Sequence, residues 1–334
     1  MSWLSDDAVE RLRRVAHWPE FEEARYAVRA ELGRGGMGTV FLAHDERLDR
    51  DVAIKVSAAA SPGSEFEARL EAEAAILARL EHPGIVPVHD AGRLADGRRF
   101  VVMKRVEGET LARHLERVPS LAERLRIFER VCEPVSFAHA RGFVHRDLKP
   151  DNVMIGRFGE VLVMDWGVAK ILGTGEPEGG ASDGGVPGAG TGAGTVLGTR
   201  GFMAPEQATG GAADVDARAD VYALGAILVT LLGAGERPGE ASSPSERLAA
   251  LRGVPRRLRA IVERALAPSP GDRYPSAESL AADVARFRAG DPVEAHRENV
   301  FERLARWLHR YRVAVALVLA YLVMRVAIAL FWRR

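Results

Sequence analysis

Residues 145–152 read His145-Arg146-Asp147-Leu148-Lys149-Pro150-Asp151-Asn152. An apolar segment precedes this stretch, and the apolar run 161–164 follows it and ends at Asp165-Trp166-Gly167. Two carboxylates and an amide are therefore expected on loops at the ends of short strands. Asp147 can accept a proton from a hydroxyl group, while Asn152 and Asp165 offer the hard oxygen ligands that Mg²⁺ prefers. Because Lys149 can also reach a transferred phosphate, the arrangement suits phosphoryl transfer.

This stretch resembles the catalytic loop and metal-binding turn of eukaryotic-like protein kinases. The resemblance extends over about residues 28–290 and implies an α+β fold of two lobes. A small β-rich lobe with one key helix (28–106) would precede a larger helical lobe (107–290). The alternative, a charged surface loop that joins a helix to a hairpin, is disfavoured by the matching motifs on either side.

The composition limits the class of protein. The 334 residues carry 46 basic and 46 acidic side chains, so there is no excess of positive charge that would indicate binding of nucleic acid. Cys132 is the only cysteine, which excludes an intrachain disulfide and fits a reducing compartment. Residues 1–27 are charged and carry apolar residues at helical spacing, which predicts a helical extension before the first lobe.

A glycine-rich stretch opens the small lobe and reads Leu32-Gly33-Arg34-Gly35-Gly36-Met37-Gly38-Thr39-Val40. Glycines let backbone N–H groups close over phosphates without obstruction by side chains. Dinucleotide-binding folds use a similar spacing, but there the glycines open a helix. Here β-forming residues flank the glycines on both sides, so the pattern predicts a hairpin, the form that covers ATP in the kinase family.

A lysine ends the next apolar strand, Val52-Ala53-Ile54-Lys55. An unpaired ammonium is costly to bury, so this position needs a partner. The resemblance implies that Lys55 holds the ATP phosphates and pairs with a carboxylate on the following helix. Glu67, Glu71 and Glu73 all lie on the predicted helix 65–80, and the spacing of the family favours Glu73.

The resemblance also places an adenine site at the end of the apolar strand 100–103. Residues 104–108 would join the two lobes, and the backbone of Lys104 and Val106 would bond the base. Met103 would close the back of the pocket. Four further apolar side chains would enclose the base, namely Leu32, Val40, Ala53 and Met154.

The predicted activation segment spans about residues 165–206. Residues 173–194 are almost all Gly, Ala, Pro, Ser, Thr and acidic residues, which cannot bury enough apolar surface to offset the entropy of ordering. Thr191 and Thr195 are the favoured sites of autophosphorylation, and a flexible insertion with unmodified hydroxyls is the alternative. Arg146, by resemblance, would pair with the new phosphate, or would bond loop carbonyls.

Three contacts in the large lobe follow from the resemblance alone, namely Thr199 with Asp147 and Lys149, Glu206 with Arg273, and Asp220 with the catalytic-loop backbone. The sequence pattern predicts two helices over residues 110–142 and further helices at about 256–267 and 276–289. Trp166 stands where the family has Phe. By resemblance it would form a column that links the lobes with Leu77, Val88 and His145.

The last part of the chain predicts attachment to a membrane. Residues 291–312 are a basic amphipathic run, which predicts a helix lying on a membrane surface or packed on the kinase lobe. Residues 313–332 have the length of a membrane span and only one charge, Arg325. Arg325 costs about 2.5–3.5 kcal/mol near the bilayer centre. The eleven Val, Leu, Ile and Phe residues contribute about −3 to −7 kcal/mol, so insertion is favoured.

The charges around this segment predict a single-pass anchor that leaves the kinase domain in the cytoplasm, because basic residues are denser before it. A helix buried in a dimer is the alternative. The predicted activity is transfer of the ATP γ-phosphate to Ser or Thr hydroxyls of proteins, including the chain itself, in bacterial signalling. ATP and Mg²⁺ are the implied cofactors. The implied partners are protein substrates, a membrane and a second copy for trans-autophosphorylation, with no nucleic acid.

Two other functions stay open. A pseudokinase would only bind ATP, and the full set of catalytic and metal-binding side chains disfavours it. A small-molecule phosphotransferase is disfavoured by the Ala204-Pro205-Glu206 element and the Thr199 turn, which the family uses to dock protein substrates.

Overall fold

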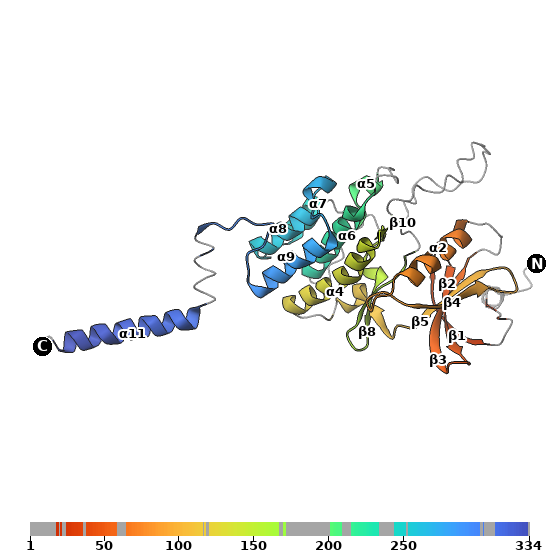
Figure 1. The fold of residues 1–334 in the computed structure, drawn as a ribbon, viewed down its shortest axis with the longest axis horizontal. Coiled ribbons are helices and arrows are strands. Elements are labelled where there is room, and N and C mark those ends of the chain that lie inside the picture. Colours follow the sequence, from red (N-terminus) through yellow and green to blue (C-terminus); the bar gives the residue numbers. More distant parts are fainter. Residues whose placement is uncertain are drawn as a thin grey trace, which may run out of the picture.

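A computed structural model gives two lobes, a sheet-rich lobe at the N-terminal side and a helical lobe after it (Figure 1). The residues it describes are 18–19, 21, 25–35, 38–58, 65–115, 117, 120–166, 170–171, 201–208, 215–233, 244–251, 253–300, 303 and 311–332.

The N-lobe is a five-stranded antiparallel sheet in the order β1-β2-β3-β5-β4. Its strands are β1 (Tyr26–Gly35), β2 (Gly38–Asp45), β3 (Arg50–Ser57), β4 (Val88–Arg93) and β5 (Arg99–Lys104). Alternate apolar side chains point to one face, so Phe41 and Ala43 of β2 are buried beside Val52 and Ile54 of β3. Helix α2 (Glu65–Arg79) is the one long helix described in this lobe. The predicted hairpin is confirmed, because β1 and β2 pair on either side of the glycines.

The C-lobe is built around helices whose apolar faces share one core with α2. Its helices are α3 (Leu111–His114), α4 (Leu121–Ala140), α5 (Pro205–Ala208), α6 (Ala217–Leu232), α7 (Pro244–Ala250), α8 (Arg256–Ala265) and α9 (Ala277–Ala289). Helix α6 lies at the centre and is buried from Ala219 to Leu231. Side-chain caps fix where the helices start. Ser120 accepts from the Glu123 N–H before α4, and Ser276 and Ser279 form a capping box before α9.

Short strands carry the loops at the boundary between the lobes. β8 (Val153–Gly156) pairs with β6 (Gly108–Thr110) on one side and β9 (Val161–Val163) on the other. β7 (Phe143–Val144) pairs with β10 (Lys170–Ile171). The catalytic stretch therefore lies between β7 and β8, and its turn Pro150–Asn152 is a 3-10 helix. Asp165 follows β9, so strand ends bring it beside this stretch.

The described part of the N-terminal extension packs on the N-lobe. Trp18 contacts Phe41 at a ring distance of 5.6 Å, and Phe21 contacts Phe100 at 5.0 Å. The sheet begins at Tyr26, two residues before the predicted start of the lobe at 28. Most of the helix predicted over 1–27 lies outside the described residues.

The prediction of a helix over 291–312 is wrong in its first part, because residues 291–299 are irregular. The backbone N–H groups of Glu294 and Ala295 donate to the Asp283 carboxylate at 2.6 and 3.0 Å. Asp283 is fully buried on α9 and also accepts from the Tyr274 hydroxyl at 2.7 Å. This fixed acceptor competes with helical hydrogen bonds and ties the segment to the C-lobe.

Helix α11 (Arg312–Phe331) coincides with the apolar segment predicted at 313–332 and extends away from the C-lobe helices (Figure 1). Among the residues that the structure describes, no helix meets the length and apolarity required to cross a membrane. The predicted span is not supported by this criterion.

Gly38, the last glycine of the hairpin, has a backbone that only glycine tolerates. Its φ is +152°, and a Cβ there would lie 2.1 Å from the Val56 carbonyl oxygen of the neighbouring strand. Gly38→Ala should therefore lower the free energy of unfolding by about 2 kcal/mol or more. Gly33→Ala is the matched control, because a Cβ at Gly33 meets nothing within 4 Å. Thermal unfolding checks this, and equal melting temperatures for the two variants would contradict it.

Candidate active site

Lys55 on β3 lies between two carboxylates from separate parts of the chain. Its Nζ donates to Glu73 Oε2 at 2.7 Å and to Asp165 Oδ1 at 2.9 Å. Glu73 is on α2 and Asp165 follows β9, so this one ammonium joins the sheet, the helix and the C-lobe. The side chains of Lys55 and Glu73 are 12% and 4% exposed, so water screens the Lys55–Glu73 pair weakly.

The ionisation of this triad follows from burial and charge together. Burial disfavours the Lys55 ammonium, but Glu73 and Asp165 outweigh it and raise the pKa of Lys55 above its ordinary value. Burial raises the pKa of Glu73, although Lys55 opposes that shift. Burial also acts to raise the pKa of Asp165, but the charge and hydrogen bond of Lys55 outweigh burial, so the pKa of Asp165 is lowered. Asp165 is therefore ionised at neutral pH, as a metal ligand must be.

The structure decides between two of the three glutamates that the sequence left as candidates. Glu73 contacts Lys55, while Glu71 is exposed and pairs with Arg99 on β5. The side chain of Glu67 lies outside the described residues. Of the two glutamates whose side chains are described, Glu73 is thus the one that pairs with Lys55.

The catalytic stretch brings its three polar side chains together. Lys149 Nζ donates to Asp147 Oδ2 at 2.8 Å. Asn152 Nδ2 donates to the same oxygen at 3.1 Å and to the Asp147 backbone carbonyl at 2.8 Å. With its amide nitrogen so engaged, Asn152 keeps its Oδ1 as the atom for a metal ion.

Hydrogen bonds join this group to the Lys55 triad. The Met164 N–H donates to the Asn152 carbonyl at 2.9 Å, and the His145 ring lies 2.9 Å from the Met164 carbonyl oxygen. Arg146 and Asp165 have φ values of +69° and +63°, in the left-handed region that non-glycine residues rarely adopt. Two such residues at one site mark backbone that the surrounding contacts hold in place.

Asp220 on α6 supplies much of that restraint. Its carboxylate accepts from the His145 N–H at 2.8 Å and the Arg146 N–H at 2.9 Å, and lies 2.7 Å from the His139 ring. The predicted contact with the catalytic-loop backbone is therefore present. His139 was not predicted, because it lies 81 residues from Asp220 along the chain and no local pattern links them.

Asp220→Asn should destabilise the protein by about 3 kcal/mol at pH 7, because it removes a buried charge that three donors surround. Burial favours the protonated acid, but the hydrogen bonds from His139 and the loop hold the pKa of Asp220 below its ordinary value. The carboxylate therefore stabilises the fold at every pH above the unfolded pKa of about 3.9, and this contribution is lost as pH falls through the lower folded pKa. Urea unfolding of both proteins should give the full difference at pH 7–8, and the contribution of the carboxylate should be lost only in strong acid. A difference that vanished already at pH 6 would contradict this.

One contact of the column predicted between the lobes is present, that of Trp166 with His145. Trp166 is fully buried and contacts the His145 ring at 4.6 Å between centroids. Leu77 of α2 belongs to the same buried cluster, and Val88 of β4 packs against it. Tryptophan in place of phenylalanine is accommodated without exposure.

The side chains predicted to surround adenine come from five strands, β1, β2, β3, β5 and β8. Ala53 of β3 pairs with Met103 of β5, and Lys55, two residues further along β3, pairs with Val40 of β2. Leu32 on β1 is 54% exposed. The Lys104 N–H is already bonded to the Pro87 carbonyl at 3.0 Å, so Lys104 offers a base its carbonyl oxygen. Gly36 lies outside the described residues.

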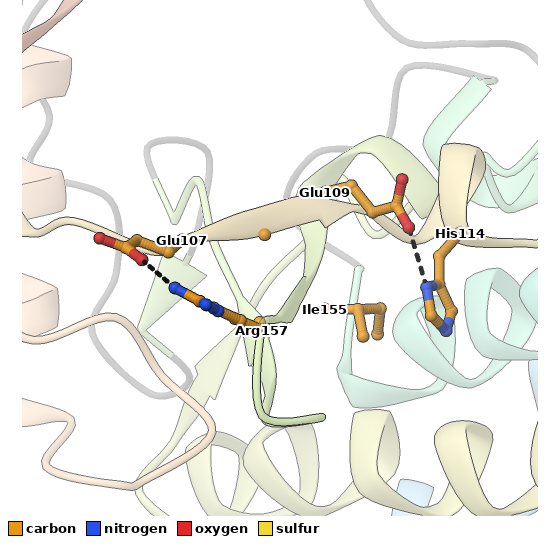
Figure 2. A pocket seen from close by; sticks show the side chains of 7 residues that line it. Glu107, Glu109, His114, Ile155 and Arg157 are labelled. Atoms are coloured by element: carbon orange, nitrogen blue, oxygen red, sulfur yellow. Dashed lines mark hydrogen bonds and ion pairs between the residues drawn. The ribbon is translucent and has the colours of Figure 1, made fainter.

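A hollow of about 490 Å³ opens beside the link between the lobes (Figure 2). Its lining includes Glu107 just before β6, Glu109 on β6, Ile155 on β8, Arg157 in the turn after β8, and His114 of α3. It contains none of the catalytic side chains. Because successive residues of a strand face opposite sides, Ile155 faces this hollow and Met154 faces the other way.

The contact predicted between Glu206 and Arg273 is present, with two hydrogen bonds of 2.6 and 2.8 Å. Arg273 is buried, so this bidentate pair fixes the end of the predicted activation segment to the C-lobe. Gln207 was not predicted. Its Nε2 donates to the Arg146 carbonyl at 2.8 Å and so reaches the catalytic stretch. Thr191, Thr195 and Thr199 lie outside the described residues, and their predicted contacts stay predictions.

The structure has a β-sheet lobe and a helical lobe that a Lys–Glu–Asp triad joins, with an Asp–Lys–Asn group beside the triad. This combination defines a protein kinase domain. The family model described as protein kinase domain matches residues 26–283, and the chain belongs to that family.

Curated relatives and solved structures agree. The chain is 37% identical over 295 residues to serine/threonine-protein kinase PknB of Mycobacterium tuberculosis, covering 83% of this chain and 45% of the relative. It is 36% identical over 296 residues to PknD of Chlamydia caviae, covering 80% of this chain and 32% of the relative. The PknI kinase domain of Mycobacterium tuberculosis superposes with a TM-score of 0.60 at 31% identity, over 79% of this chain and 96% of that one. The chain thus spans less than half the length of these curated relatives.

Proposed function

We propose that the protein transfers the γ-phosphate of ATP to serine and threonine hydroxyls of protein substrates. The observation that carries this is the Lys55 ammonium, held 2.7 Å from Glu73 and 2.9 Å from Asp165 beside the Asp147 group. Both relatives are named serine/threonine-protein kinases, which supports the same substrate class.

Each polar group has a role in this proposal. Asp147 accepts the proton of the attacking hydroxyl, and Lys149 offsets charge on the transferred phosphate. Lys55 holds the phosphates of ATP in the position that Glu73 fixes. The backbone of the β1–β2 hairpin, with Gly33, Gly35, Gly36 and Gly38, covers those phosphates.

The residues present fit a magnesium ion. The amide nitrogen of Asn152 bonds Asp147, which leaves the amide oxygen as the donor for an ion, and Asp165 has an ionised carboxylate; both are hard oxygen donors that Mg²⁺ takes. Among the described residues no cluster of three or more His, Cys, Asp or Glu could hold a metal by itself. Two protein ligands are enough when phosphate oxygens and water supply the others. When bound, Mg²⁺ neutralises charge that develops on the phosphates.

The test is incubation of the full chain with γ-labelled ATP, Mg²⁺ and a mixture of proteins, followed by phosphoamino-acid analysis. Label on serine and threonine that disappears with EDTA is expected. Label on free metabolites but not on proteins would favour a small-molecule phosphotransferase. Binding of ATP without any transfer would favour a pseudokinase.

We also propose that the chain phosphorylates its own activation segment at Thr191 or Thr195, in a pair of copies. The position of these threonines between Asp165 and Glu206 supports this, as does Arg146 in the catalytic stretch. Phosphosites should be mapped by mass spectrometry after ATP is added. A tagged Asp147→Asn copy should become phosphorylated by the wild type, and a copy that stays unmodified would exclude transfer between chains.

Attachment to a membrane through α11, with the kinase domain on the cytoplasmic side, is a further proposal. Apolar side chains of this helix are exposed, among them Val313 at 67%, Leu317 at 66% and Val323 at 68%. The protein should stay with membranes after carbonate extraction, and replacement of Leu317 and Val323 by aspartate should release it. Release of the wild type would overturn the proposal.

A further inference from the structure

The link between the lobes carries opposite charges at neighbouring positions. Arg105 and Glu107 lie between β5 and β6, on either side of Val106. The Arg105 guanidinium turns back to β3, where Nη1 is hydrogen-bonded to Asp51 Oδ2, and the same Nη1 lies 3.6 Å from Glu107 Oε1. The side chains of Arg105 and Asp51 are 31% and 25% exposed, so this pair is partly sheltered from water.

Asp51 is itself held by two other strands of the N-lobe. Its Oδ1 accepts from Arg29 Nη1 of β1 at 3.1 Å and lies 3.0 Å from His44 Nδ1 of β2. The hydrogen bond with His44 and the charges of Arg29 and Arg105 lower the pKa of Asp51 against the effect of burial. An ionised carboxylate fixed by two strands is a firm point of attachment for Arg105.

The other end of this set of charges reaches the C-lobe. Glu107 Oε2 lies 3.8 Å from Arg157 Nη1, and the Arg157 N–H donates to the Glu107 carbonyl at 2.7 Å. Figure 2 shows the two side chains facing each other across the start of β6 and the turn after β8. We call Asp51, Arg105, Glu107 and Arg157 the connector network. It runs from β3 over the link to the β8–β9 turn.

The place of Arg105 gives the network a consequence for nucleotide binding. Its backbone is flanked by Lys104 and Val106, whose backbone groups are the proposed contacts to adenine. Anchoring the Arg105 side chain to Asp51 restricts the peptide units on both sides of it. A backbone already held in its bound conformation loses less conformational entropy when ligand binds.

We propose that Asp51 and Arg105 are positioning residues that preset the adenine-binding backbone and so raise the affinity for ATP. This rests on the proposed kinase function. Neither side chain is required to touch ATP or the reacting atoms, so the affinity for ATP should change while the chemical step does not.

The first experiment compares Asp51→Asn and Arg105→Gln with the wild type in steady-state kinetics and in binding of a fluorescent ATP analogue. Each variant should raise the KM for ATP and the Kd of the analogue about fivefold, with kcat within about twofold of the wild type. Salt screens exposed charges, so the difference should shrink in 0.5 M NaCl, a concentration well beyond about 0.15 M physiological strength. The double variant should lose little more than either single one, because both remove the same pair.

Asp49→Asn is the matched control. Asp49 lies two residues before Asp51, is 98% exposed, and contacts His44 Nε2 at 3.2 Å. Its KM for ATP should equal that of the wild type. Variants that lower the melting temperature but leave KM and Kd unchanged would show a merely structural pair and overturn the inference.

Two outcomes separate this inference from the proposed function. If the wild type binds no ATP, the kinase proposal fails and the inference fails with it. If the wild type binds and transfers phosphate while Arg105→Gln has an unchanged Kd, only the inference fails. Arg105→Gln alone decides if Asp51→Asn does not fold, because Arg105 lies in an irregular, partly exposed segment.

Discussion

Asp147→Asn is expected to lower kcat for protein phosphorylation by about 10³-fold, within the range that a positioned base contributes. The amide matches the carboxylate in size and can still accept from Lys149 and Asn152, which lie 2.8 and 3.1 Å from Oδ2. What it lacks is the negative charge that attracts the hydroxyl proton. The KM for ATP should change little, because Lys55 and the link between the lobes are untouched. Rates of label transfer to a protein substrate measure this.

Asp151→Asn is the matched control for that experiment. Asp151 lies four residues later in the same stretch, carries the same side chain and is exposed. It should keep the wild-type rate. Equal loss in both variants would point to disruption of the loop, and equal transfer by Asp147→Asn and the wild type would remove Asp147 from the chemistry.

The parts of the site that could be predicted were those in which neighbouring residues of the sequence indicate the chemistry. The hairpin around Gly33 and Gly38 follows from β-forming residues on both sides of the glycines, and the structure pairs them as expected. Lys55 was recognisable because an ammonium that ends an apolar strand needs a carboxylate. Its partner was harder, since three glutamates lie on one helix. Family spacing chose Glu73, and the contact at 2.7 Å agrees.

The parts that could not be predicted depend on contacts between distant residues. Asp283 orders residues 294 and 295 by accepting their N–H groups, and nothing in the basic run 291–312 indicates that acceptor. His139 with Asp220 and Arg105 with Asp51 are separated by 81 and 54 residues. A charged side chain has many possible partners along the sequence, so periodicity and propensity do not select one. Only the packing of the folded elements against one another does.

Lys55→Met is expected to reduce kcat/KM for ATP by about 10²–10³-fold, as loss of a preorganised charge at the phosphates would. It should also destabilise the fold by about 3 kcal/mol, because Glu73 and Asp165 would be left as neighbouring carboxylates with no cation between them. Burial already raises the pKa of Glu73, so Glu73 would take up a proton to relieve the repulsion.

The double variant Lys55→Met/Glu73→Gln supplies a neutral group at that position from the start. It should therefore recover most of the lost stability in urea unfolding while its activity stays as low as that of Lys55→Met. Recovery of both together would mean that Lys55 acts only through folding, and recovery of neither would mean that repulsion between the two carboxylates is not what destabilises the single variant.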